Sequence, residues 1–241
     1  GGKSALATSS GQSAQFIALN NILEAGDNFV STSHLYGGTY NQFKSQFKRL
    51  GVEARFTPED TPEEFEKLID EHTKLIYLET IGNPGLNVPD FEAIAAVAER
   101  YDIPLIVDNT FATPINCRPF EWGADIVTHS TTKYMDGHAT CVGGAIVDSG
   151  NFDWEAHADK FPGLTQPDES YHGLAYSKKF GKLAYITKAT AQLMRDLGSI
   201  QSPQNAFLLN LGLETLHLRM RQHCKNAQAV AEYLEANDKV A

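Results

Sequence analysis

The sequence predicts an α/β protein: one three-layer α/β/α domain around a mostly parallel sheet of seven strands. Short apolar runs alternate with segments of helical periodicity along most of the chain, which is typical of a doubly wound sheet. The run at residues 105–107 has no polar break, as expected for a strand buried on both faces. Polar residues follow several of these runs directly, so we expect ligands to bind at the carboxyl edge of the sheet.

Seven segments are predicted as strands because they are short, apolar or β-branched, and bounded by turn-forming residues. In chain order they are residues 4–8, 28–32, 52–56, 74–80, 105–107, 124–128 and 141–147. No helix-length connection precedes the last two strands, which leaves an antiparallel arrangement open for that part of the sheet.

Helical periodicity and capping residues place helices between and after these strands. Thr61 with Pro62 begins one helix, and Asp90 caps another. The predicted helices are residues 14–23, 39–50, 61–70, 91–100, 184–197 and 202–236, the last with a kink or a join at Gly212. The charged side chains of residues 215–236 are interpreted as a solvent-facing side rather than a binding patch: Arg219, Arg221, Lys225, Glu232 and Glu235.

Composition narrows the functional classes. The 241 residues are 42% hydrophobic, enough for a sizeable core, and carry a formal net charge of -10 without a basic stripe. Nucleic acids and anionic membranes are therefore poor partners.

The three cysteines are far apart in the sequence, which indicates a reducing compartment and predicts a cytoplasmic protein. No apolar run approaches membrane-spanning length, and His129 and His138 lack further ligands, so we expect no metal site.

Two successive predicted strands deliver an acid and a lysine to the same edge of the sheet. Asp108 ends the strand at residues 105–107, and Lys133 follows the strand at residues 124–128. This pair suits pyridoxal 5′-phosphate, which forms a Schiff base with a lysine. An acid beside the pyridine nitrogen keeps that nitrogen protonated, and the ring can then accept electrons. We therefore expect Lys133 to bond to the cofactor and Asp108 to pair with its ring.

A phosphate-binding turn is predicted at the same edge. Gly11 and Gln12 stand in a Gly/Ser turn before a helix, where free N–H groups and the positive helix end attract an anion. Ser130 and Thr132, close to Lys133, add hydroxyl groups. Taken alone, the Gly/Ser turn is more often an ordinary connection between a strand and a helix.

Two further residues are predicted to face the cofactor ring. Tyr36 lies in a loop after a strand and can stack on a flat ring, although a packed loop aromatic is the alternative. Asn83 lies in a tight loop after the predicted strand at residues 74–80 and supplies a polar group for the phenolic oxygen of the ring. Each residue alone is a weak signal, whereas the ordered set predicts a pyridoxal-phosphate site.

Five segments of the chain resemble the cystathionine-γ-synthase-like family of pyridoxal-phosphate enzymes, the Cys/Met-metabolism group of fold type I. They are residues 9–14, 33–39, 79–84, 107–114 and 129–134. The resemblance implies that Lys133 is the cofactor-bonded lysine and the proton shuttle, and that Tyr36 helps to activate the leaving group. The cofactor contacts that it implies are the phosphate ligands Gly11, Gln12, Ser130 and Thr132, the ring contacts Tyr36, Asp108 and Asn83, and the supporting residue Glu79.

Within this family, residues 161–174 and 206–220 are most similar to O-acetylhomoserine sulfhydrylases. The implied reaction is γ-replacement, in which O-acetyl-L-homoserine reacts with sulfide or a thiol to give homocysteine or methionine and acetate. The alternatives are a cystathionine γ-synthase, a methionine or cystathionine γ-lyase, and an inactive cofactor-binding fragment. A Rossmann oxidoreductase is disfavoured because no G-x-G-x-x-G follows the first strand. Residues 161–173 are interpreted either as a wall of the substrate entrance or as a connecting loop.

The resemblance also implies how the chain is organised. We expect residues 1–241 to form the cofactor-binding large domain of fold type I, without the N-terminal arm and the C-terminal small domain of the family. Those regions supply substrate and phosphate contacts in family members, which makes turnover by the isolated domain doubtful. The family further implies a homotetramer built from dimers, with an amino acid and sulfide or a thiol as substrates.

Overall fold

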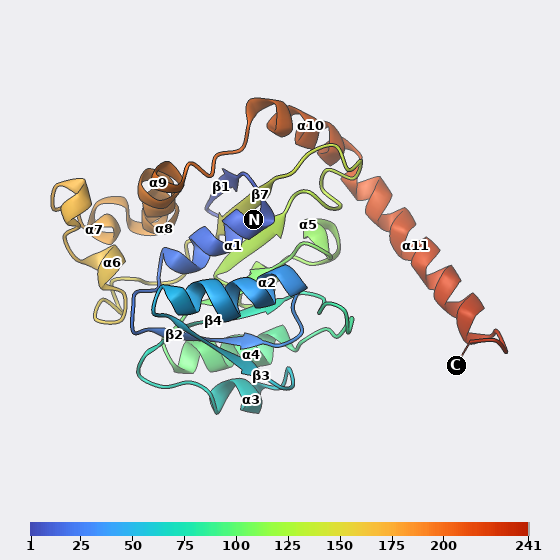
Figure 1. Ribbon diagram of the computed structural model, residues 1–241, viewed down its shortest axis with the longest axis horizontal. Coiled ribbons are helices and arrows are strands. Elements are labelled where there is room, and N and C mark those ends of the chain that lie inside the picture. Colours follow the sequence, from blue (N-terminus) through green and yellow to red (C-terminus); the bar gives the residue numbers. More distant parts are fainter. Residues whose placement is uncertain (241) are drawn as a thin grey trace.

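The computed structural model describes residues 1–240, which form a single seven-stranded sheet with helices on both faces (Figure 1). The strands are β1 (Ser4–Thr8), β2 (Asn28–Thr32), β3 (Glu53–Thr57), β4 (Thr73–Glu79), β5 (Leu105–Asp108), β6 (Ile126–Ser130) and β7 (Gly144–Asp148). Their order is β1-β7-β6-β5-β4-β2-β3. Strand β7 is antiparallel to β1 and β6, whereas all other pairs are parallel. The predicted fold class is therefore confirmed.

Side chains alternate between two hydrophobic layers, as the period of a strand requires. On β4, Tyr77 packs in the layer of α1 (Gly11–Asn20), and the side chains of Ile76 and Leu78 pack in the layer of α4 (Phe91–Arg100). Both layers bury their large apolar residues almost completely. The strands are thus covered on both faces, and their carboxyl ends remain the open edge for a ligand.

The remaining helices complete the two layers and the C-terminal region. They are α2 (Gly37–Asn41), η1 (Gln42–Phe47), α3 (Pro62–Glu66), α5 (Thr113–Asn116), η2 (Pro119–Trp122), α6 (Pro162–Thr165), η3 (Glu169–Tyr171), α7 (Tyr176–Phe180), η4 (Gly181–Leu183), α8 (Ala184–Lys188), η5 (Ala189–Met194), α9 (Arg195–Leu197), α10 (Pro203–Glu214) and α11 (Leu216–Glu235). Several predicted bounds were wrong. Helix α1 begins at Gly11 rather than residue 14, because the hydroxyl of Ser10 accepts the N–H of Ser13 and caps the helix.

The chain from residue 202 onward forms two helices rather than one bent helix. The join lies at Thr215, between α10 and α11, and not at Gly212. Gly212 instead allows a close approach, because a Cβ there would lie 2.3 Å from the carbonyl oxygen of Asp136. Helix α11 projects away from the body of the molecule (Figure 1). The interpretation of Arg219 as solvent-facing was wrong, since its guanidinium is bonded to the body of the protein.

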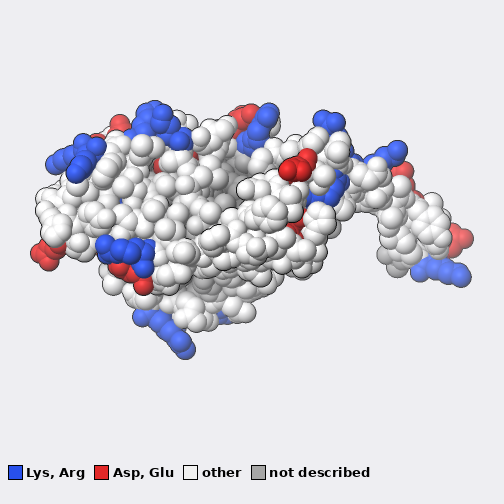
Figure 2. All heavy atoms as spheres, turned by 90° about the horizontal axis from the view of Figure 1, so that it is seen from above, with Lys and Arg blue, Asp and Glu red and all other residues white. Residues whose placement is uncertain are grey.

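Charged side chains of both signs are scattered around the edge of the face seen in Figure 2, and its centre carries few of them. That face therefore presents no continuous basic surface. Of the helices within residues 1–240, none combines the length and the apolar character that crossing a membrane requires.

Candidate active site

A pocket of about 320 Å³ opens at the carboxyl edge of the sheet. It is lined by residues from the ends of β4, β5 and β6 and from the starts of α1 and α2. All residues predicted for the site line this pocket: Gly11, Gln12, Tyr36, Glu79, Asn83, Asp108, Ser130, Thr132 and Lys133. The structure therefore brings together side chains that are up to about half the chain apart in sequence, while their individual roles stay predictions.

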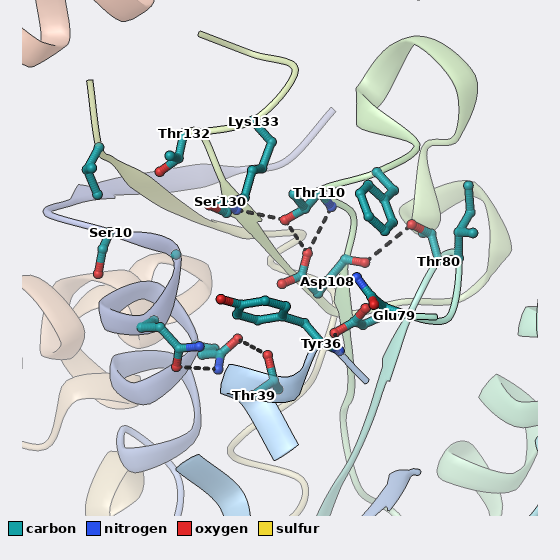
Figure 3. A pocket seen from close by; sticks show the side chains of 17 residues that line it. Ser10, Tyr36, Thr39, Glu79, Thr80, Asp108, Thr110, Ser130, Thr132 and Lys133 are labelled. Atoms are coloured by element: carbon teal, nitrogen blue, oxygen red, sulfur yellow. Dashed lines mark hydrogen bonds between the residues drawn. The ribbon is translucent and has the colours of Figure 1, made fainter. Parts of the chain in front are cut away.

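Asp108 stands at the end of β5, in the middle of the sheet. Its Oδ1 atom accepts hydrogen bonds from the backbone N–H of Thr110, at 2.8 Å, and from the Thr110 hydroxyl. The same hydroxyl accepts the N–H of Ser130 at 2.8 Å. Thr110 thus fixes the carboxylate of Asp108 and ties the end of β5 to the end of β6 (Figure 3).

Glu79 lies beside Asp108, because the two residues face each other in the register of β4 and β5. Burial raises the pKa of both carboxyls, and the charge of Asp108 raises that of Glu79 further. The backbone N–H of Tyr36 donates to Glu79 Oε1 at 2.8 Å and opposes part of this rise in the Glu79 pKa. Two neighbouring buried acids provide a strong local preference for a cation, such as a protonated pyridine ring.

The phosphate end of the pocket is formed by the first turn of α1. Among residues 1–240, no group accepts the backbone N–H of Gly11 or Gln12, so both are available to an anion. Gly11 packs directly on the end of β6, since a Cβ there would lie 2.5 Å from the Cβ of Ser130. This contact brings the helix N-terminus to the hydroxyls of Ser130 and Thr132. The donor set fits a phosphate group.

Lys133 lies in the turn after β6 and is exposed at the pocket. Within the described part of the chain, its ammonium group has no ion-pair partner. Figure 3 shows Lys133, Thr110 and Asp108 above the ring of Tyr36. A lysine without a fixed partner next to an anchored acid fits the covalent attachment of pyridoxal phosphate.

The ring of Tyr36 lies across the pocket and is not a packed loop aromatic. The residue is 51% exposed and immediately precedes α2. The carboxylate of Glu79 fixes its backbone and leaves the ring free to cover a flat ligand. Asn83 reaches the pocket from the loop after β4, and its N–H donates to the carbonyl oxygen of His34 at 3.3 Å.

Sequence reasoning missed a buried polar group behind the pocket. The amide of Gln15 donates to the side chain of Gln12 at 3.0 Å and accepts the hydroxyl protons of Thr39, at 3.2 Å, and Tyr77, at 3.3 Å. Gln15 is almost fully buried, so its amide holds together α1, α2 and β4. A polar residue on the otherwise apolar side of this helix was the available signal.

Residues 161–173, predicted as either a wall of the substrate entrance or a connecting loop, lie outside this pocket. Phe161 and Leu164 are buried in the layer of α1, and none of the described residues in this segment lines the pocket. His129, considered for a metal, is buried, which lowers its pKa to about 4. No cluster of three or more His, Cys, Asp or Glu side chains suited to a metal occurs among residues 1–240.

Known proteins are similar to this sequence over its whole length. Residues 1–241 match the family described as Cys/Met metabolism PLP-dependent enzyme. A homocysteine/cysteine synthase from Saccharomyces cerevisiae is 55% identical over 100% of this chain and 54% of that protein. The O-acetyl-L-homoserine sulfhydrylase 1 of Thermus thermophilus is 51% identical over 100% of this chain and 57% of that protein. The chain thus spans about half the length of the curated relatives it matches.

Solved structures share the fold. A protein from Campylobacter jejuni, assigned as an O-acetylhomoserine (thiol)-lyase, has a TM-score of 0.95 and 37% identity over 99% of this chain and 58% of that chain. Its structure carries a pyridoxyl-lysine monophosphate. An O-acetylhomoserine sulfhydrylase from Wolinella succinogenes has a TM-score of 0.86 and 37% identity over 98% of this chain and 64% of that chain. The chain belongs to the Cys/Met metabolism family of PLP-dependent enzymes.

Proposed function

We propose that this chain supplies the cofactor-binding domain of an O-acetyl-L-homoserine sulfhydrylase. The reaction replaces the acetate of O-acetyl-L-homoserine with sulfide or a thiol and gives homocysteine or methionine. The observation that carries the proposal is the position of Asp108, which ends β5, and Lys133, which follows the adjacent β6, in one pocket with the N-terminus of α1. The names of relatives in which about half of the residues aligned with this chain are identical support the choice of substrate.

In this proposal each polar group has one task toward the cofactor. Pyridoxal phosphate, when bound, supplies an electron sink for chemistry at the carbons of an amino acid. Asp108 holds the proton on the ring nitrogen, while the N–H groups of Gly11 and Gln12 bind the phosphate with the hydroxyls of Ser130 and Thr132. Tyr36 covers one face of the ring. These contacts orient the reacting centre and exclude water from it.

Lys133 carries the acid–base chemistry in this proposal. Its amine would hold the cofactor until the amino group of the substrate takes its place, and the freed amine would then move protons at Cα and Cβ of the substrate. In Figure 3, Tyr36 lies on the side of the pocket opposite Lys133, where its hydroxyl can assist the departure of acetate. Glu79 holds the backbone of Tyr36 and acts as a positioning residue.

We further propose that residues 1–241 are the large domain of a longer, cytoplasmic, homotetrameric enzyme. The shorter length of the chain relative to its relatives supports the first point. The three cysteines are free, which is usual in a reducing compartment. The family resemblance supports the tetramer.

The first experiment is a visible absorption spectrum of the chain with added pyridoxal phosphate, beside Lys133→Ala. We expect the parent to show the absorption of a lysine-bound cofactor that survives dialysis and is bleached by borohydride, because Lys133 is the lysine at the pocket. The variant should not show it. Lys178→Ala, an exposed lysine on α7, is the matched control and should behave as the parent does.

Turnover is then measured on a chain extended at both ends to the length of its relatives. We expect acetate release from O-acetyl-L-homoserine with sulfide, and none from the Lys133→Ala variant. Product formed only with cysteine as the acceptor would contradict the sulfhydrylase in favour of a cystathionine synthase. Cleavage without any acceptor would identify a γ-lyase.

A further inference from the structure

The guanidinium of Arg219, on α11, contacts the turn that carries Lys133. Its Nη1 donates to the carbonyl oxygen of Tyr134 at 2.7 Å, and its Nη2 lies 3.4 Å from that of Met135. Nη2 also donates to the carbonyl oxygen of Gly212 at 2.7 Å, and Nε donates to the Thr215 hydroxyl at 3.0 Å. One side chain therefore bonds to the two residues that follow Lys133, to Gly212 in the last turn of α10, and to Thr215 at the join of α10 and α11.

All four acceptors of Arg219 are neutral oxygens. Within residues 1–240, no carboxylate forms an ion pair with its guanidinium. The carbonyl of Gly212 lies in the last turn of α10, where a helix leaves its carbonyls without partners in the helix. A cation is favourable at that end of a helix, and the planar arginine fork can reach several carbonyls at once.

Two glycines make room for this contact. A Cβ at Gly137 would lie 2.3 Å from Nη1 of Arg219, and Gly137 has a positive φ of 73°. A Cβ at Gly212 would lie 2.3 Å from the carbonyl oxygen of Asp136. The backbone of α10 at Gly212 therefore lies directly on the turn, and the absence of a Cβ at Gly137 leaves the space that the Arg219 guanidinium fills.

The turn is also held by backbone hydrogen bonds and by contacts of the Tyr134 ring with the rings of Phe111 and His223. The N–H of Gly137 donates to the carbonyl oxygen of Lys133 at 2.8 Å, and the N–H of Asp136 donates to that of Thr131 at 3.0 Å. The carboxylate of Asp136 accepts hydrogen bonds from His138, Thr140 and Cys141 and so holds the following loop. The carbonyls directly after Lys133 are bonded by Arg219.

We propose that Arg219 is a positioning residue that holds the Lys133 turn in the geometry needed for bond formation with pyridoxal phosphate. The inference rests on the proposed function of Lys133 and adds a residue about 85 positions further along the chain. Loss of the guanidinium leaves the carbonyls of Tyr134 and Met135 without this partner, and the turn gains freedom. Because α11 buries only Leu216 and Met220 against the body, the Arg219 contact also couples the position of this helix to that of Lys133.

The test compares Arg219→Met and Arg219→Lys with Arg221→Met. Arg221 is exposed on the same helix, and its side chain has no hydrogen-bond partner in the described chain, so it is a matched control. The first measurement is hydrogen exchange at the Asp136 and Gly137 amides in the cofactor-free protein. The second is the rate at which added pyridoxal phosphate becomes bonded to Lys133, followed by visible absorption.

We expect Arg219→Met to accelerate exchange at these two amides at least tenfold and to slow bond formation with the cofactor at least tenfold. Arg219→Lys should lie between this variant and the parent, because an ammonium cannot reproduce the fork. Arg221→Met should match the parent in both measurements.

Parent-like values of both quantities in Arg219→Met would overturn the inference, even if the free energy of unfolding falls, because the role would then be structural only. If that variant does not fold, Arg219→Lys decides: parent-like exchange and capture rates would show that the fork is not needed. A parent chain that never bonds the cofactor contradicts the proposed function instead, and hydrogen exchange still tests the role of Arg219.

Discussion

At the scale of single residues, the pocket depends on how Asp108 is held. Thr110 fixes one carboxylate oxygen, and the other side of the acid faces Glu79 across β4 and β5. Burial favours the neutral acid and raises the pKa of Asp108 to about 6, so a cation in the pocket would stabilise the charged form. A protonated cofactor ring meets that requirement, which makes Asp108 a selective anchor.

Replacing Asp108 with asparagine should weaken cofactor binding strongly. The amide keeps the shape of the side chain but removes the negative charge, and a hydrogen bond to a charged group is worth about 1.5–3 kcal/mol, or roughly 10- to 100-fold in affinity. The dissociation constant of pyridoxal phosphate is measured by absorption titration. Asp159→Asn, at an exposed site, serves as the control. Equal affinities in all three proteins would rule out the anchoring role.

At the scale of elements, the contact between α1 and β6 builds the phosphate end of the pocket. Helix α1 starts at Gly11 because Ser10 caps it, and the absence of a Cβ at Gly11 lets the helix touch Ser130. The helix N-terminus and the β6 hydroxyls therefore share one small space. A change in the spacing of these two elements would separate the N–H donors from the hydroxyls.

Gly11→Ala tests this contact. The new Cβ would collide with Ser130, so we expect roughly tenfold weaker binding of pyridoxal phosphate and a loss of about 1–3 kcal/mol in the free energy of unfolding, as for other overpacked sites. Urea unfolding and absorption titration measure the two effects. Gly37→Ala is the matched control, because Gly37 is the first residue of α2 and a Cβ there meets nothing within 4 Å. If both alanine variants bind the cofactor equally, close packing at Gly11 does not matter.

At the scale of the whole molecule, buried carboxyl groups make stability depend on pH. Burial raises the pKa of Asp125 to about 7 and that of Asp148 to about 6, from an ordinary value of 3.8. Both groups lie at the end of the sheet away from the pocket, since Asp125 precedes β6 and Asp148 ends the antiparallel strand β7. The folded chain therefore retains protons that the unfolded chain releases.

The sign of this effect predicts that the free energy of unfolding of the cofactor-free chain falls as pH rises from about 4 to about 7. Asp148 alone should account for about 1–3 kcal/mol of the fall, because one pKa unit corresponds to about 1.4 kcal/mol. Asp148→Asn should flatten the decline measured by urea unfolding at pH 5 and pH 8. Asp159→Asn should leave it unchanged. An identical decline in Asp148→Asn would show that this carboxyl does not contribute.

The alternation of strands and helices, the buried central strand and the polar residues at its edge could all be predicted from the amino-acid sequence. These features are local: the apolar run at residues 105–107 and the acid after it mark a buried parallel strand and its ligand-binding end. Lys133 and Asp108 could be predicted to lie close together, because consecutive parallel strands end at the same edge of the sheet. The alternation of predicted strands and helices also indicated a mostly parallel sheet.

Tertiary structure decided which residues support the site. The facing positions of Glu79 and Asp108 follow from the register of two strands, and the close contact of Gly11 with Ser130 follows from the packing of α1 on β6. In the sequence, Arg219 is one of several charged residues on a polar helix. Its contact with the Lys133 turn becomes apparent only from the position of α11 in the folded protein. Such contacts join residues tens of positions apart. Helical periodicity and capping patterns describe only neighbours along the chain, so they carry no information about these partners.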